Sequence, residues 1–173
     1  MKDTIEDLLT RRSVRQYTDK PVKKADLETI LKAGSYAASG MGKQSPRIIA
    51  TQNKELIARL SALNNKYLGA NSDPFYGASS LAIVFADTSM PTYLYDGSLV
   101  MGNMMNAARA LGLGSCWIHR AKEVFASEEG KALMKKWGVP ESYEGIGHLV
   151  VGYAAKPAGE AAPRKDDYIT WVE

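Results

Sequence analysis

The sequence is poor in the residues that build disulfides and metal centres. It holds one cysteine, Cys116, and two histidines among 173 residues. A single cysteine excludes a disulfide within the chain and any cysteine-built zinc or iron–sulfur site. The histidines, His119 and His148, lie far apart in sequence, so we expect no metal.

Long hydrophobic runs are also missing. No stretch approaches the roughly 20 apolar residues of a membrane span. Residues 1–9, MKDTIEDLL, carry acids where a secretory signal would be apolar. We therefore expect no membrane partner and a cytoplasmic location.

The chain has little excess charge. Its 22 Lys and Arg stand against 19 Asp and Glu, a net charge of +3. That excess is well short of the field expected of a general nucleic-acid coat, so any cluster of charge must be local. The 45% hydrophobic content is ordinary for globular proteins. We expect one domain over residues 1–173.

Hydrophobic periodicity and apolar runs predict the secondary structure. Helices are expected near 4–12, 26–33, 53–63, 98–111 and 121–139. Strands are expected at 47–52, 81–86, 115–119, 148–154 and 167–173. The continuous apolar run 81–86 is typical of a strand buried on both faces.

Helices that alternate with a few apolar strands indicate a layered α/β fold, with helices on both faces of a central sheet. The segment 167–173 follows a long loop and has no helix after it. We expect this last strand to join a sheet elsewhere, that of a partner chain included.

Three arginines and a serine lie close together near the start of the chain. Arg11, Arg12, Ser13 and Arg15 offer guanidinium forks and a hydroxyl, the donors that bind a phosphate. Arginines at a helix C-terminus can also be dipole partners worth about 0.3–1 kcal/mol each. The spacing leaves both interpretations open.

Two further stretches have composition suited to a flat ligand. Residues 38–46, ASGMGKQSP, lack large side chains, so that backbone can approach a ligand while Gln44 supplies an amide. Residues 112–120, GLGSCWIHR, could turn backbone N–H groups toward a cofactor. The alternatives are a flexible loop for the first and a core strand for the second, with Cys116 a small buried side chain.

Five segments in this order resemble the nitroreductase family of FMN-dependent oxidoreductases: RRSVRQY, ASGMGKQ, DPFYGAS, GLGSCWIHR and PRK. The resemblance covers nearly the whole chain. It implies a three-layer sandwich, a central mixed sheet flanked by helices. It also implies a homodimer with FMN at the interface and a C-terminal strand exchanged with the partner.

The resemblance assigns cofactor contacts but no catalytic residue. It places Arg11, Arg12, Ser13 and Arg15 at the FMN phosphate and ribityl chain, with Arg164 and Lys165 as a second cationic contact. From the partner it brings Ala38, Ser39, Gly40, Gly42 and Gln44. Near the flavin ring it places Asn71, Trp117, Ile118, His119 and Arg120.

The implied activity is electron transfer from NAD(P)H through FMN to an electron-poor small molecule, such as a nitroaromatic or quinone, in a ping-pong cycle. Two alternatives stay open: a flavin carrier or sensor with little turnover, and a small basic nucleic-acid-binding module. Against the second, the aromatic residues do not alternate with the basic ones.

The sequence departs from the family pattern at four positions. Gly42 stands where many relatives have Asn, and Pro46 where they have Trp. His119 and Arg120 stand where glycine is common. These departures bear mainly on which acceptor is used.

Overall fold

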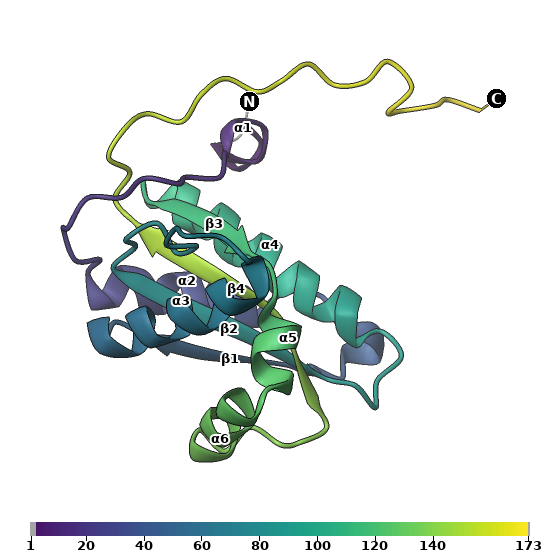
Figure 1. Ribbon diagram of the computed structural model, residues 1–173. Helices are drawn as coiled ribbons and strands as arrows, with labels where there is room; N and C mark the ends of the chain where they lie inside the picture. Colours follow the sequence, from purple (N-terminus) through teal and green to yellow (C-terminus); the bar gives the residue numbers. More distant parts are fainter. Residues whose placement is uncertain (1–2, 173) are drawn as a thin grey trace.

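The computed structural model describes residues 3–172, and a four-stranded sheet in the order β1-β2-β4-β3 lies at its centre (Figure 1). The strands are β1 (Pro46–Thr51), β2 (Ser80–Asp87), β3 (Gly114–Ile118) and β4 (Tyr143–Gly152). Each corresponds to a predicted strand, but β4 begins at Tyr143, five residues before the predicted start at His148.

Every pair of neighbouring strands is antiparallel, so the expected mixed sheet is wrong for these four strands. Within residues 3–172, parallel pairing occurs only at an isolated bridge between Ser13 and Ser115. Thr51 at the end of β1 lies opposite Leu81 at the start of β2. The chain between them therefore leaves and returns to the same end of the sheet, which makes the pair antiparallel.

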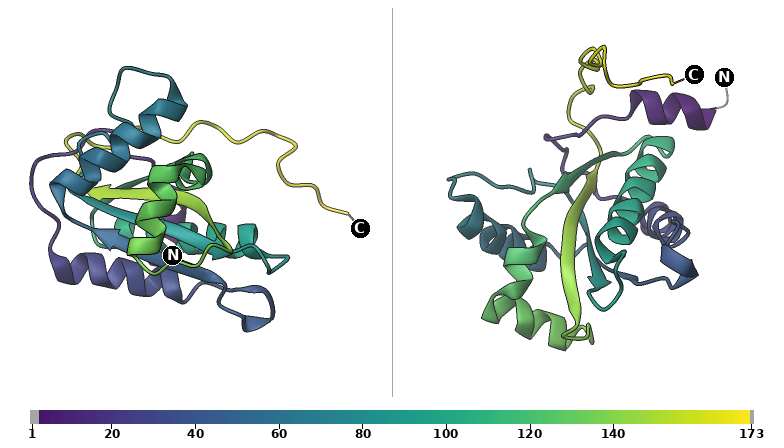
Figure 2. Two further views of the ribbon diagram at one scale, coloured as in Figure 1. Left: turned by 60° about the horizontal axis from the view of Figure 1, so that its bottom comes forward. Right: turned by 90° about the vertical axis from the view of Figure 1, so that its right-hand side faces the viewer.

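Helices cover both faces of the sheet, as predicted (Figure 2). The first face carries α2 (Lys24–Ser35) and α4 (Tyr93–Ala110). The opposite face carries α3 (Lys54–Leu68), α5 (Ala121–Ala126) and α6 (Glu128–Lys136). Alternate residues of β2 serve the two faces: Ile83 packs with α3 and α5, whereas Val84 packs with α2 and α4.

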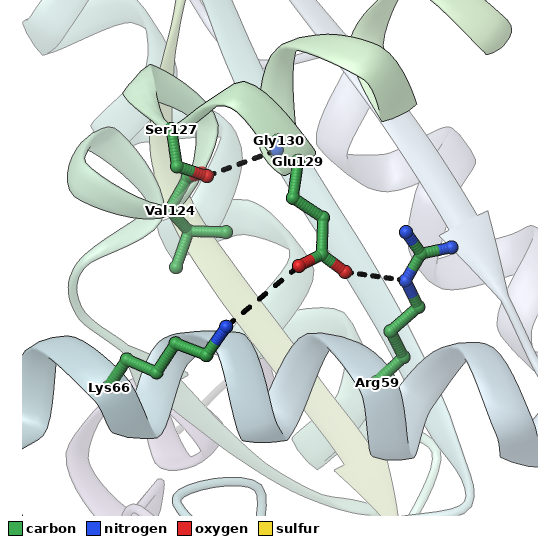
Figure 3. Close-up of polar contacts among 6 residues, drawn as sticks. All are labelled: Arg59, Lys66, Val124, Ser127, Glu129 and Gly130. Atoms are coloured by element: carbon green, nitrogen blue, oxygen red, sulfur yellow. Dashed lines mark hydrogen bonds and ion pairs between the residues drawn. The ribbon is translucent and has the colours of Figure 1, made fainter.

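The helix predicted over 121–139 is two helices, α5 and α6, which meet at Ser127. This residue has extended backbone (φ −71°, ψ 158°), and its Oγ accepts a hydrogen bond from the Gly130 N–H at 3.1 Å (Figure 3). Serine thus caps α6, a role that hydrophobic spacing does not reveal. Glu129 joins α6 to α3 through exposed ion pairs with Arg59 and Lys66, which solvent screens.

Of the remaining helices, α1 (Asp3–Thr10), α2 and α3 start within two residues of their predicted positions, whereas α4 begins at Tyr93, five residues before the predicted start at 98. In α3 the Asn53 side chain accepts from the Leu56 N–H, as its place in the sequence suggests. The short α1 lies over one end of the molecule, and a 3-10 turn, η1, covers Gly40–Gly42. None of the helices in residues 3–172 is long and apolar enough to cross a membrane.

The C-terminal strand over 167–173 is expected to join a sheet elsewhere, that of a partner chain included, and its exchange with a partner stays a prediction. Residues 155–172 are exposed and form no strand, and Glu173 lies outside the described residues. Figure 1 shows this tail running past α1 and away from the body. Trp171 is 90% exposed. The β-branched and aromatic side chains of this tail are exposed in the single chain that the structure describes.

Candidate functional site

The arginines after α1 carry buried N–H groups that nothing in the described chain satisfies. Arg12 Nη1 donates to the carbonyls of Leu9 and Arg11, at 2.9 and 2.7 Å, so this arginine does cap the helix. Arg12 Nε and Arg11 Nη1, however, are buried and have no hydrogen-bond partner within residues 3–172. Buried donors are nearly always paired, so these two fit an anionic oxygen supplied by a ligand.

This segment lies along the outer edge of the sheet. The Val14 N–H donates to the Ser115 carbonyl at 3.0 Å, beside the bridge from Ser13. Because strand residues alternate in direction, Trp117 also turns its N–H outward from β3. The described chain therefore presents an arginine cluster beside an open strand edge.

The turn after β3 is held from the protein interior. Asn64 on α3 is fully buried and donates through Nδ2 to the His119 carbonyl at 2.8 Å. Arg120, the next residue, has left-handed backbone at φ 75°. Asn64 was not predicted from the sequence. It could have been found as a polar residue that shares the apolar face of α3 with Ile57 and Leu60.

His148 on β4 is also fully buried, and its side chain points to the face of the sheet that α3 and α5 cover. Its ring lies between Phe75 and Phe125, with centroids 5.2 and 5.7 Å away. Burial lowers the pKa of His148 to about 3. A hydrogen bond with the His119 backbone raises this pKa, but by less than burial lowers it. The imidazole is therefore a neutral part of the core.

The buried imidazole makes the protein sensitive to acid. In the unfolded chain this group takes a proton near pH 6.5, but in the folded chain only near pH 3. Stability should fall by about 2–3 kcal/mol between pH 6.5 and 4.5. Urea unfolding of the wild type and of His148→Gln at both pH values measures this, and an equal decline in both would contradict it.

The stretch of small residues is anchored by a carboxylate that sequence reasoning also missed. Asp96, near the start of α4, is 2% exposed. It accepts from the Gly40 N–H at 3.0 Å, Ser45 Oγ at 2.8 Å and Thr92 Oγ1 at 3.1 Å. Burial alone would raise the pKa of Asp96, but these hydrogen bonds outweigh it and hold the pKa below its ordinary value. Local sequence gives no signal for contacts that span some fifty residues.

Unusual backbone conformations gather in the same segments. The non-glycine residues with positive φ within residues 3–172 are Met41, Gln44, Tyr76 and Arg120. All lie in the stretches ASGMGKQ, DPFYGAS and GLGSCWIHR, and such conformations cluster at functional sites. Gly42 is also left-handed, at φ 64°. Glycine and Asn are the residues that best tolerate this geometry, which explains their exchange here.

A single chain keeps the loop and the arginines apart. Asp96 holds the loop at the start of α4, whereas Arg109 near its end contacts Asp7 at 3.7 Å and Thr10 Oγ1 at 3.1 Å. At about 1.5 Å per residue, these two ends of the helix are about 20 Å apart. The residues Ala38–Gln44 therefore do not meet Arg11 and Arg12 within one protomer.

The other predicted contacts are dispersed. Asn71 is exposed after α3 and lines a hollow of about 600 Å³ with Lys54 and Asp73. Arg164 and Lys165 lie in the exposed tail and make no side-chain hydrogen bond or ion pair within residues 3–172. Their roles stay predictions, as does that of the Trp117 indole, whose Nε1 is buried without a partner in the described chain.

Known proteins resemble this chain in sequence and in fold. The family model for the nitroreductase family matches residues 8–72 and 66–153. The chain belongs to the nitroreductase family. A candidate NADH dehydrogenase/NAD(P)H nitroreductase of Archaeoglobus fulgidus is 31% identical over 159 residues, 88% of this chain and 86% of its own.

Solved members of the nitroreductase family share the fold. A Bacteroides fragilis nitroreductase with bound FMN superposes with a TM-score of 0.91, at 28% identity over 100% of both chains. A Desulfitobacterium hafniense nitroreductase with bound FMN gives 0.89, at 27% identity and the same coverage. The three-layer architecture expected from the sequence is thus that of the nitroreductase family.

Proposed function

We propose that this chain is an FMN-dependent oxidoreductase that takes electrons from NAD(P)H, built as one domain over residues 1–173. The observation that carries this is the pair of buried, unpartnered guanidinium N–H groups of Arg11 and Arg12 beside an open strand edge. Family members with the same fold contain FMN. The phosphate of FMN is a dianion that these donors suit.

The chain's own residues have separate tasks in holding the cofactor. Arg11, Arg12 and Ser13 bind the phosphate, and the exposed Arg15 serves the ribityl chain and the ring's polar edge. The outward N–H of Trp117 and the turn at His119 and Arg120 offer backbone donors to the ring. When bound, FMN supplies the capacity to accept a hydride and release electrons. No side chain here needs to act as acid, base or nucleophile.

Each site is completed by a second copy of the chain. Within one protomer the loop Ala38–Gln44 is held near the start of α4 and the arginine segment near its end, about 20 Å along the helix, so the loop serves the partner's cofactor. Exposed apolar side chains give such a dimer its surface. On α1 and α4 they are Ile5, Leu8, Leu9, Leu94, Tyr95 and Leu99. The tail, with Arg164 and Lys165, wraps the partner.

Donor and acceptor use one slot in turn. NAD(P)H would bind, give up a hydride and leave as NAD(P)+, and an electron-poor small molecule such as a quinone or nitroaromatic would then bind and accept the electrons. This ping-pong order needs only one face open to small molecules, and an NAD(P)H donor is consistent with the cytoplasmic location that we propose.

Reconstitution tests the function. The purified protein should be yellow, release FMN on denaturation and oxidise NAD(P)H steadily when a quinone is added. Initial rates against both substrates should give parallel double-reciprocal lines. A colourless protein that ignores added FMN would refute the proposal, and a yellow protein without turnover would point to a flavin carrier. Sedimentation of a chain ending at Asp167 tests the tail, because an undisturbed dimer would exclude the wrapped arrangement.

A further inference from the structure

The turn after β3 carries a cation without a counter-ion in the described chain. Arg120 is half-buried, and its guanidinium makes no hydrogen bond or ion pair within residues 3–172. Nearby cations differ: Lys122 is 2.9 Å from Glu144, and Arg59 is paired with Glu129. A partly desolvated guanidinium with free donors is well suited to bind an anionic group.

The backbone of Arg120 adopts a conformation that is unfavourable for a residue with a side chain. Its φ of 75° and ψ of 15° are left-handed, a conformation that glycine adopts freely and other residues adopt at a penalty. The turn itself needs only the Arg120 carbonyl, which accepts from the Val124 N–H at 3.0 Å. Glycine would serve the turn at lower cost, so the guanidinium is there for another purpose.

The turn lies at the far end of β3 from the arginine cluster. Ser115 contacts the segment that follows Arg12, and at about 3.3 Å per residue Arg120 is about 15 Å further along. Asn64 fixes the turn through the His119 carbonyl. Arg11 and Arg120 thus mark two ends of an elongated site, one for the phosphate and one where electrons are exchanged.

We propose that Arg120 selects ligands that carry an anionic group, such as a carboxylate, sulfonate or phosphate, in the slot where donor and acceptor bind. This assignment rests on the function proposed above, because that function places the slot beside the turn. The anionic group can belong to the acceptor or to the 2′-phosphate of NADPH, and the two sources are separable by kinetics.

The test compares kcat/KM ratios for the FMN-loaded protein. The acceptor pair is 1,2-naphthoquinone-4-sulfonate and 1,2-naphthoquinone, and the donor pair is NADPH and NADH. Arg120→Gln should lower one of two ratios, that of the sulfonated to the unsulfonated quinone or that of NADPH to NADH, by about five- to tenfold relative to wild type. Division by the wild-type ratio removes the intrinsic reactivity of each compound. Arg120→Lys should restore most of the preference because it restores the charge.

Lys122→Gln is the matched control, since it removes a cation two positions away and should leave both ratios unchanged. A fall in the acceptor ratio assigns the anion to the acceptor, and a fall in the donor ratio assigns it to NADPH. Ratios unchanged in Arg120→Gln, or lowered equally by Lys122→Gln, overturn the proposal. Absence of turnover with the neutral quinone in wild type is a different result, because it refutes the oxidoreductase function itself.

A stability comparison tests the backbone premise separately. Arg120→Gly should melt at or above the temperature of Arg120→Gln, since glycine relieves the left-handed strain while both lose the charge. If Arg120→Gly is the less stable variant, the left-handed backbone does not disfavour a side chain at this position. That result would contradict the proposal.

Discussion

Replacing Arg12 with alanine is expected to weaken FMN binding by about ten- to a hundredfold. A charge-assisted hydrogen bond contributes roughly 1.5–3 kcal/mol, and Arg12 offers a buried Nε–H with no partner in the described chain. Flavin fluorescence titration of the apoprotein measures the Kd directly. Arg11→Ala should behave similarly, because Arg11 Nη1 is also buried and unpartnered.

Arg59→Ala is the matched control for this experiment. It removes the same charge from α3, where Arg59 is occupied by Glu129, and should leave the Kd for FMN unchanged. Arg12 also caps α1 through the Leu9 carbonyl, so melting temperatures must accompany the titrations. A folded Arg12→Ala protein with wild-type FMN affinity would show that this segment is only the end of a helix.

Local chemistry accounts for most of the architecture that the sequence predicts. The unbroken apolar run 81–86 became β2, buried on both faces, and Asn53 caps α3 as its position indicates. These features depend on neighbours in sequence, where periodicity and capping preferences apply. The arginine cluster was visible for the same reason, since its members are adjacent.

Features that depend on distant residues were not predictable. The break between α5 and α6 is different, because Ser127 caps the Gly130 N–H three residues further on, a local signal that the hydrophobic spacing of 121–139 does not show. Residues 167–172 form no strand within one chain, because strand propensity needs a sheet edge to pair with, and their pairing with a partner chain stays a prediction. The polar contacts of Asn64 and Asp96 link segments far apart in sequence. Both are buried polar residues that share a helix face with buried apolar residues, which is the pattern to search for.

Replacing Asp96 with alanine should cost about 3–4 kcal/mol of folding stability. The change leaves the Gly40 N–H and the hydroxyls of Ser45 and Thr92 without their shared acceptor in a buried site. For a chain of this size the melting temperature should fall by roughly 10 °C. Ser45→Ala and Thr92→Val each remove one donor and leave the carboxylate two others, so each should cost only about 1 kcal/mol.

Asp96 should also affect the cofactor without touching it. Its carboxylate fixes the loop that we assign to the partner's FMN, so Asp96→Asn should raise the Kd for FMN although Arg11 and Arg12 are intact. Unchanged affinity in a folded, dimeric Asp96→Asn protein would limit the residue to a structural role.

Acid distinguishes the contribution of Asp96 from that of His148. The pKa of Asp96 lies below its ordinary value in the fold, so its stabilisation is complete above the unfolded pKa of about 3.9 and is lost as the pH falls through the lower folded pKa. The stability gap between wild type and Asp96→Asn should therefore stay constant from pH 7 to 5 and narrow only below about pH 4. The loss of stability caused by His148 begins near pH 6.5. If the stability difference between wild type and Asp96→Asn narrows between pH 7 and 5, Asp96 is not the ionised acceptor of these three donors.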